Sequence, residues 1–151
     1  MTFNLLKKLL FVSSITLCFF NMQCKDDDDV DLPEDTICQD VVIIDSELYK
    51  NTSSDTYRLS SASIAGDCLI INFGASGCSG SSWEYKMVDS GAVAESLPEQ
   101  RFLKFQLVNN EDCLAFFTRE QSFDIRSLQI EGSNQIILNI EGFSESLTYN
   151  Y

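Results

Sequence analysis

The chain has 151 residues, of which 23 are acidic, 10 are basic and none is histidine, so its formal net charge is −13. This acidic balance, without a basic patch, excludes the electrostatic footprint of a nucleic-acid-binding protein. The absence of histidine excludes Ser-His-Asp and Cys-His catalytic arrangements.

The first 23 residues have the organisation of a signal peptide. Lys7 and Lys8 give a positive start, and residues 9–20 form an uncharged, mostly apolar run. A membrane-spanning helix needs about 20 apolar residues, whereas the apolar region of a signal peptide is shorter. A buried helix of a soluble domain is the alternative, but the run lies at the extreme N-terminus and is followed by a block of charges. We therefore expect residues 1–23 to be a lipoprotein signal peptide.

Cys24 is the expected site of lipidation and the first residue of the mature protein. Cys18 lies inside the apolar run and is followed by Phe19 and Phe20, which suits the signal peptide. Two or more acyl chains anchor a protein firmly, at about 0.8 kcal/mol per buried CH2 group. The expected membrane partner is therefore reached through acyl chains on Cys24, without a transmembrane helix.

An acidic tract follows the cysteine directly, in the order Lys25, Asp26, Asp27, Asp28 and Asp29. The junction resembles the export signal of surface lipoproteins of the Bacteroidota, particularly flavobacteria. This resemblance implies delivery to the outer membrane with exposure at the cell surface. A solvated leader is the alternative, because like charges repel and extend a chain. Residues 24–37 are predicted to be an acidic flexible tether, in which Asp35-Thr36-Ile37 resembles the O-glycosylation motif of the same phylum, with Thr36 as the acceptor.

The remaining residues, 38–151, are predicted to form one domain. They contain 16 acidic and 7 basic residues, a net charge near −9. Short strand patterns recur about every ten residues, separated by turn signals and without a long helix. The sequence therefore predicts an all-β fold, an antiparallel, immunoglobulin-like β-sandwich of about eight strands, with a small β-barrel as the alternative.

Individual strands show a period of two. Trp83, Tyr85 and Met87 share one face of a strand over residues 83–88, and the same alternation occurs over residues 102–108. Trp83 is the only tryptophan, and we expect it in the core rather than in contact with a sugar. Residues 74–82 are rich in Gly and Ser and are predicted to be a loop, and residues 109–112 a hairpin turn.

Four cysteines fall within this domain: Cys38, Cys68, Cys78 and Cys113. An even number in a small exported domain indicates disulfides. Zinc is the alternative, although the chain lacks both Cys-x-x-Cys pairs and histidine. If successive strands run up and down, Cys38 and Cys68 lie at one end and the other two at the opposite end. Because bridged Cα atoms lie within about 7 Å, the compatible pairs are Cys38–Cys68 and Cys78–Cys113.

No motif in the domain carries an evident chemistry. The run of residues 74–80 lacks the spacing of a nucleophile elbow and the ending of a phosphate loop. Carboxylates that could act as a hydrolytic pair are numerous, and none stands out: Glu84, Asp89, Glu95, Glu111 and Asp112. We expect no catalytic residue, no cofactor and no metal.

The domain also resembles small uncharacterised flavobacterial lipoproteins in three segments, residues 66–69, 77–84 and 89–96. This resemblance implies an exported domain of unknown function without catalytic residues.

Our functional hypothesis is a non-enzymatic, surface-anchored binding module for a glycan or a protein. Binding loops on a rigid sandwich are a common arrangement, and the residues expected to contact the ligand are Ser79, Ser81, Ser82, Asn110 and Asp112. The alternative is a structural or accessory subunit of an outer-membrane complex that uses an edge strand. A histidine-free carboxylate hydrolase is a weaker third reading.

Overall fold

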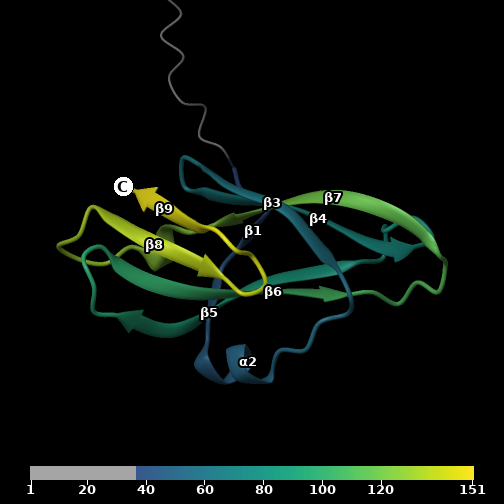
Figure 1. Cartoon of the computed structure of the whole chain (residues 1–151), viewed down its shortest axis with the longest axis horizontal. Helices are drawn as coiled ribbons and strands as arrows, with labels where there is room; N and C mark the ends of the chain where they lie inside the picture. Colours follow the sequence, from purple (N-terminus) through teal and green to yellow (C-terminus); the bar gives the residue numbers. More distant parts are fainter. Residues whose placement is uncertain (1–36) are drawn as a thin grey trace, which may run out of the picture. The chain divides into compact units, whose positions relative to one another are not determined.

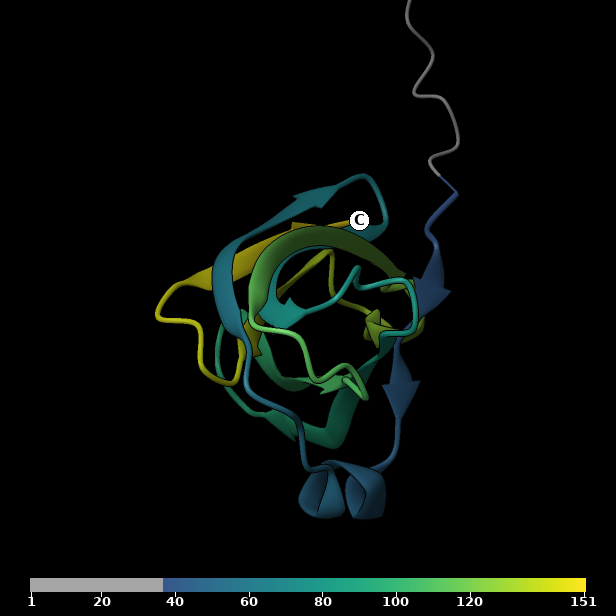
Figure 2. The same cartoon turned by 90° about the vertical axis from the view of Figure 1, so that its right-hand side faces the viewer.

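A computed structural model describes residues 37–151, which form two packed β-sheets (Figures 1 and 2). The elements in chain order are β1 (Asp40–Val41), β2 (Ile43–Ile44), α2 (Ser46–Asn51), β3 (Arg58–Ala65), β4 (Cys68–Gly77), β5 (Glu84–Ala94), β6 (Glu99–Val108), β7 (Ala115–Asp124), the 3-10 helix η1 (Arg126–Leu128), β8 (Gln135–Ile140) and β9 (Ser146–Asn150). Sheet A has the order β1-β7-β4-β3, and sheet B the order β2-β5-β6-β8-β9. The signal peptide, Cys24, the acidic export signal and Thr36 lie outside the described residues.

The prediction of an all-β sandwich is confirmed, but both sheets are mixed rather than purely antiparallel. The pairs β1 with β7, β2 with β5, and β6 with β8 are parallel. After β6 the chain crosses to sheet A, where it forms β7, and it then returns to sheet B as β8. Because β7 lies between them in the chain, β8 runs in the same direction as β6. Each sheet has two edge strands, so residues 37–151 do not form the closed barrel that was the alternative prediction.

The core lies between the sheets and is built by the predicted alternation of side chains. Phe73 of β4, Phe105 of β6 and Phe123 of β7 are fully buried, and the Phe73 and Phe105 ring centroids are 4.8 Å apart. Trp83 is 6% exposed and packs in the same cluster, as expected. Buried aromatic rings of this size contribute much of the apolar area that stabilises a domain.

The first described residues join the two sheets along one side, as the end-on view in Figure 2 shows. Val42 is buried between β1 and β2, and its N–H donates to the Asp124 carbonyl at 3.1 Å. Three residues later the Asp45 N–H donates to the Asp89 carbonyl of sheet B, also at 3.1 Å. The β-branched run of residues 41–44 is thus divided between two short strands that belong to different sheets.

Helix α2 is not among the elements predicted from the sequence, although its start carries a recognisable signal. The Asp45 carboxylate accepts hydrogen bonds from the Glu47 and Leu48 N–H groups at 2.9 and 2.8 Å, which is the N-cap arrangement. The helix packs against β5 of sheet B, and Val88 of that strand is fully buried although it lies outside the core cluster. Lys104 donates to the Tyr49 carbonyl at 3.1 Å and holds the helix there.

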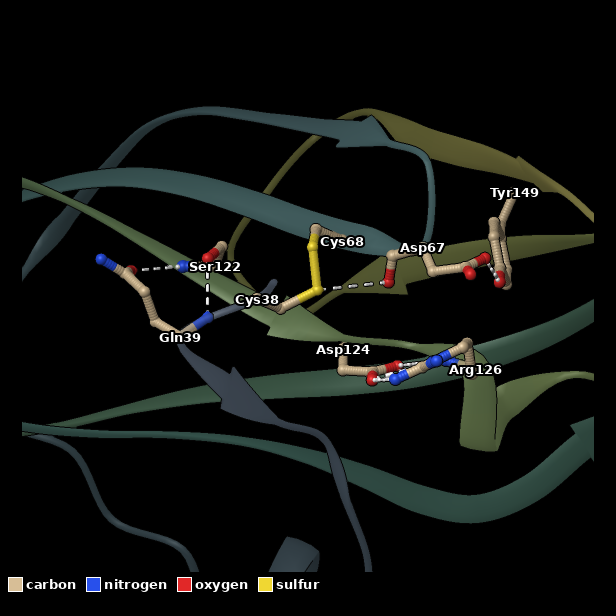
Figure 3. The surroundings of a disulfide bond; sticks show 8 residues. All are labelled: Cys38, Gln39, Asp67, Cys68, Ser122, Asp124, Arg126 and Tyr149. Carbon is tan, nitrogen blue, oxygen red and sulfur yellow. Dashed lines mark hydrogen bonds and ion pairs between the residues drawn. A yellow bond between two sulfur atoms is a disulfide. The ribbon is translucent and has the colours of Figure 1, made fainter. Parts of the chain in front are cut away.

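Both predicted disulfides are present, and each fastens one end of β4. Cys38 is bonded to Cys68, the first residue of β4, and Figure 3 shows the adjoining contacts of Gln39 with Ser122. Cys78 follows the last residue of β4 and is bonded to Cys113. The Cα–Cα distances are 5.6 and 4.7 Å. Because a strand rises about 3.3 Å per residue, the two bridges lie about 30 Å apart.

Two predicted loops differ from the structure. Residues 74–77 continue β4, because they pair with residues 115–118 of β7. Residues 109–112 are not a hairpin turn, since they connect β6 of sheet B to β7 of sheet A. Residues 109–112 lie at the right of Figure 1, at the end of the sandwich that also carries the Gly/Ser-rich residues 78–82; we call this end the loop end.

Removal of either disulfide is expected to lower the free energy of unfolding by about 3–4 kcal/mol on a chain-entropy account. The bridges span sequence separations of 30 and 35 residues, so the paired variants Cys38→Ala/Cys68→Ala and Cys78→Ala/Cys113→Ala should lose nearly equal stability in urea unfolding. Only the second pair should raise hydrogen exchange in residues 109–114. A difference above about 1 kcal/mol between the pairs would contradict the entropic account.

Candidate functional site

An open groove of about 390 Å³ lies at the end of sheet A that carries the Cys78–Cys113 bridge. Its walls come from three segments that are distant in sequence: the approach to β3, the end of β4 and the crossing from β6 to β7. The lining residues are Asp55, Thr56, Tyr57, Arg58, Gly74, Ala75, Ser76, Asn109, Glu111, Asp112, Cys113, Leu114 and Phe116.

Phe116, beside Leu114, is one of the two exposed large apolar side chains that line the groove. It is paired with Ser76 across the β4–β7 ladder and points to the outer side of sheet A, where it is 59% exposed. Its ring lies over Gly74, and a Cβ atom added there would clash with the tip of the ring. Gly74 thus lets an exposed aromatic ring rest against bare backbone.

Hydrogen bonds fix the polar wall of the groove. The Asn109 N–H donates to the Asp55 carboxylate, and the Asn109 side-chain amide donates to the Ser76 carbonyl, both at 2.7 Å. Arg58 and Asp112 are exposed, and within residues 37–151 neither side chain has a hydrogen bond or ion pair. The groove therefore offers one free guanidinium and one free carboxylate on a fixed frame.

Glu111 is held by the Gly/Ser-rich loop beside the groove. Its Oε2 atom accepts hydrogen bonds from the N–H groups of Cys78, Ser79 and Gly80 at 2.6, 2.9 and 2.9 Å, and its Oε1 atom accepts one from the Ser82 hydroxyl at 2.9 Å. Successive backbone N–H groups of this kind form an anion-binding nest. The N–H groups of Gly80 and Ser79 contribute most to lowering the pKa of Glu111, to about 2. The nest is therefore occupied by the protein's own carboxylate.

Three of the five predicted binding residues make hydrogen bonds within the loop that surrounds Glu111. The hydroxyl groups of Ser79 and Ser82 face Glu111, and the Ser81 hydroxyl lies 2.7 Å from that of Ser79. Asn110 is exposed next to the groove, and Asp112 is the one residue of the five that lines it. A contact between any of these residues and a ligand stays a prediction.

Sequence reasoning missed Phe116, Gly74, Arg58 and Asp55 as groove residues. A signal existed for Phe116, because consecutive phenylalanines in a strand must point to opposite faces. Phe117 packs on the core, which leaves Phe116 outside. Nothing in the sequence linked that ring to Gly74, since the two residues meet only through the pairing of β4 with β7.

Asp89, one of the carboxylates considered for hydrolysis, is fully buried and lies 3.0 Å from Arg101. Burial raises its pKa, while the Gly91 N–H, at 2.8 Å, and Arg101 act in the opposite direction. Glu84 and Glu95 are exposed at the two ends of β5. Within residues 37–151 no group of three or more His, Cys, Asp or Glu side chains is placed to hold a metal ion.

In the same part of the chain, no helix has both the length and the apolar character needed to cross a membrane.

Comparison with known proteins shows the fold and no more. No protein family and no curated protein matches the sequence. A protein of unknown function, DUF1344, from Bacteroides vulgatus is similar in structure, with 14% identity and a TM-score of 0.50 over 75% of this chain and 55% of that chain. A toxin-related protein from Parabacteroides distasonis has 14% identity and a TM-score of 0.48 over 74% of this chain and 59% of that one. This chain thus spans little more than half of either neighbour, and both come from the Bacteroidota.

Glu111→Gln should remove an acid-dependent part of the stability. The pKa of Glu111 is lowered in the folded protein from its ordinary 4.5 to about 2, so its contribution is complete above pH 4.5 and is lost as the pH falls towards 2. Melting temperatures of the variant measured between pH 2 and 5 should therefore fall less steeply than those of the wild type. Glu84→Gln removes an exposed carboxylate and serves as the control. Parallel pH profiles for wild type and Glu111→Gln would contradict the nest.

Proposed function

We propose that the protein is a lipid-anchored lipoprotein of the outer membrane, exposed at the cell surface, and that its sandwich is a non-enzymatic binding module for a glycan or a protein. One observation carries the proposal. The chain joins the domain at the Cys38–Cys68 end of β4, and the groove lies beside the Cys78–Cys113 end, about 30 Å along the strand. A domain attached at one end presents its groove at the other.

The length of the predicted tether is compatible with exposure of the groove. Residues 24–37 carry seven acidic residues and one basic residue, and like charges extend such a segment. At about 3.3–3.6 Å per residue, 14 residues reach at most about 50 Å. This reach allows the domain to stand away from the lipid surface, which would leave the groove accessible to large ligands.

The alternative role as an accessory subunit of an outer-membrane complex is favoured by β3. This eight-residue strand is one edge of sheet A, and after the register shift between Leu59 and Ser61 its last five residues, 61–65, contain no Pro and no charged residue. Natural edge strands commonly carry such residues to prevent pairing with another chain. The regular part of this edge, residues 61–65, lacks them and is suited to adding a strand from a partner.

The proposed surface location predicts the outcome of protease shaving on intact cells that produce the full chain. The wild-type domain should be released while an acylated Cys24 peptide stays in the membrane fraction, as measured by mass analysis. Cys24→Ser should lack the acyl mass and leave the membrane fraction. Protection of the wild-type domain until the outer membrane is broken would contradict surface exposure and favour the accessory subunit.

The binding role predicts site-dependent crosslinking on intact cells. A photoreactive p-benzoyl-phenylalanine in place of Asp112, which lines the groove, should form covalent adducts with envelope glycan or protein. The same group in place of Lys86, exposed on the outer side of sheet B, is the matched control. Equal adducts at the two positions, or none at position 112, would overturn the groove as the binding site.

A further inference from the structure

We propose that the groove binds a neutral glycan and that one hexose ring stacks on Phe116. The inference rests on the proposed binding role of the groove and adds the chemical class of the ligand. Trp83, the aromatic residue considered for sugar contact from the sequence, is in the core, so this role falls to a different ring.

The Phe116 ring has the properties of a stacking platform. It is 59% exposed, yet it is seated on Gly74, where no side chain lifts it from the sheet. The face of an aromatic ring is electron-rich and attracts the polarised C–H groups that line one face of a hexopyranose. A ring already held in place loses little conformational freedom when a ligand stacks on it.

The rim supplies the polar contacts that sugar hydroxyls require. Arg58 can donate hydrogen bonds and Asp112 can accept them, and no other described side chain competes for either. Asp55 and Asn109 are tied to each other and keep the rim rigid. Polar groups held in this way fix the orientation of a ligand in small-molecule sites.

Charge selects a neutral glycan over an anionic one. Asp55, Glu111 and Asp112 line the groove against the single cation Arg58, and the domain carries a net charge near −9. Uronic or sulfated sugars would be repelled by this field.

The size of the groove favours a glycan over a protein. Its volume of about 390 Å³ lies within the range for small-molecule sites. Its exposed large apolar side chains are Leu114 and Phe116, too few for the roughly 800 Å² that each partner buries in a stable protein–protein interface.

The test uses the purified full chain in detergent and a panel of hexasaccharides. The neutral members are cellohexaose, laminarihexaose, mannohexaose and β-1,4-galactohexaose, and hexagalacturonate is the anionic comparison. Saturation-transfer NMR and calorimetry should detect at least one neutral member and not the hexagalacturonate. Phe116→Ala should weaken that binding about tenfold, the order expected for loss of one stacked ring, while Phe116→Trp retains it. Phe102→Ala removes an exposed phenylalanine from the other sheet and should change nothing.

Gly74→Ala provides a second test through the same ring. The added methyl group displaces the tip of Phe116, so binding should weaken without loss of the fold, which the melting temperature checks. In the Phe116→Ala background the same substitution should have no further effect on binding, because no ring remains to be displaced.

Three results would overturn the inference: no neutral hexasaccharide binds, the anionic hexasaccharide binds best, or Phe116→Ala binds as well as the wild type. These results leave the proposed function separately testable. Groove-specific crosslinking to a protein on cells, together with no sugar binding, would identify a protein ligand. Absence of both would overturn the binding module itself.

Discussion

Two covalent bonds fix strand β4 at its ends, and the rest of the sandwich is arranged around this strand. It pairs along its length with β7 on one side and β3 on the other, and it contributes Phe73 to the centre of the core. Cys38–Cys68 attaches the incoming chain to its first residue, and Cys78–Cys113 attaches the crossing from sheet B beyond its last. A small domain has a limited core, and these bridges compensate by restricting the unfolded chain.

The same strand determines the loop end through its glycines. Gly74 leaves room for the Phe116 ring, and Gly77 leaves room for the Glu111 carboxylate beside Trp83. The Gly/Ser-rich loop after β4 resembles a ligand loop in composition, but its N–H groups bind a carboxylate from the same domain. Through these contacts with Glu111 the loop holds the crossing from β6 to β7 in place. The polar groups that are free to contact a ligand are Arg58 and Asp112, which line the groove.

The acidic character of the chain has different consequences in its two parts. Over residues 24–37 the acidic run is part of the predicted export signal, while in the described domain most carboxylates are surface groups and a few are structural. Asp45 caps a helix, the buried Asp89 pairs with the partly buried Arg101, and Glu111 fills a nest. The structural carboxylates are distinguished by the donors around them, which composition does not reveal.

The sequence by itself determined the class of fold, the burial of Trp83 and both disulfide pairs, and the structure confirms these predictions. Alternation with a period of two specifies which side chains of a strand point inward, and the positions of cysteines along successive strands restrict which can meet. Only the tertiary structure decided the parallel pairs, the crossing at residues 109–112, the Glu111 nest and the seat of Phe116 on Gly74. Alternation does not specify which strands become neighbours or in what register. Phe116 and Gly74 lie 42 positions apart, and their contact exists only because β4 and β7 pair as they do.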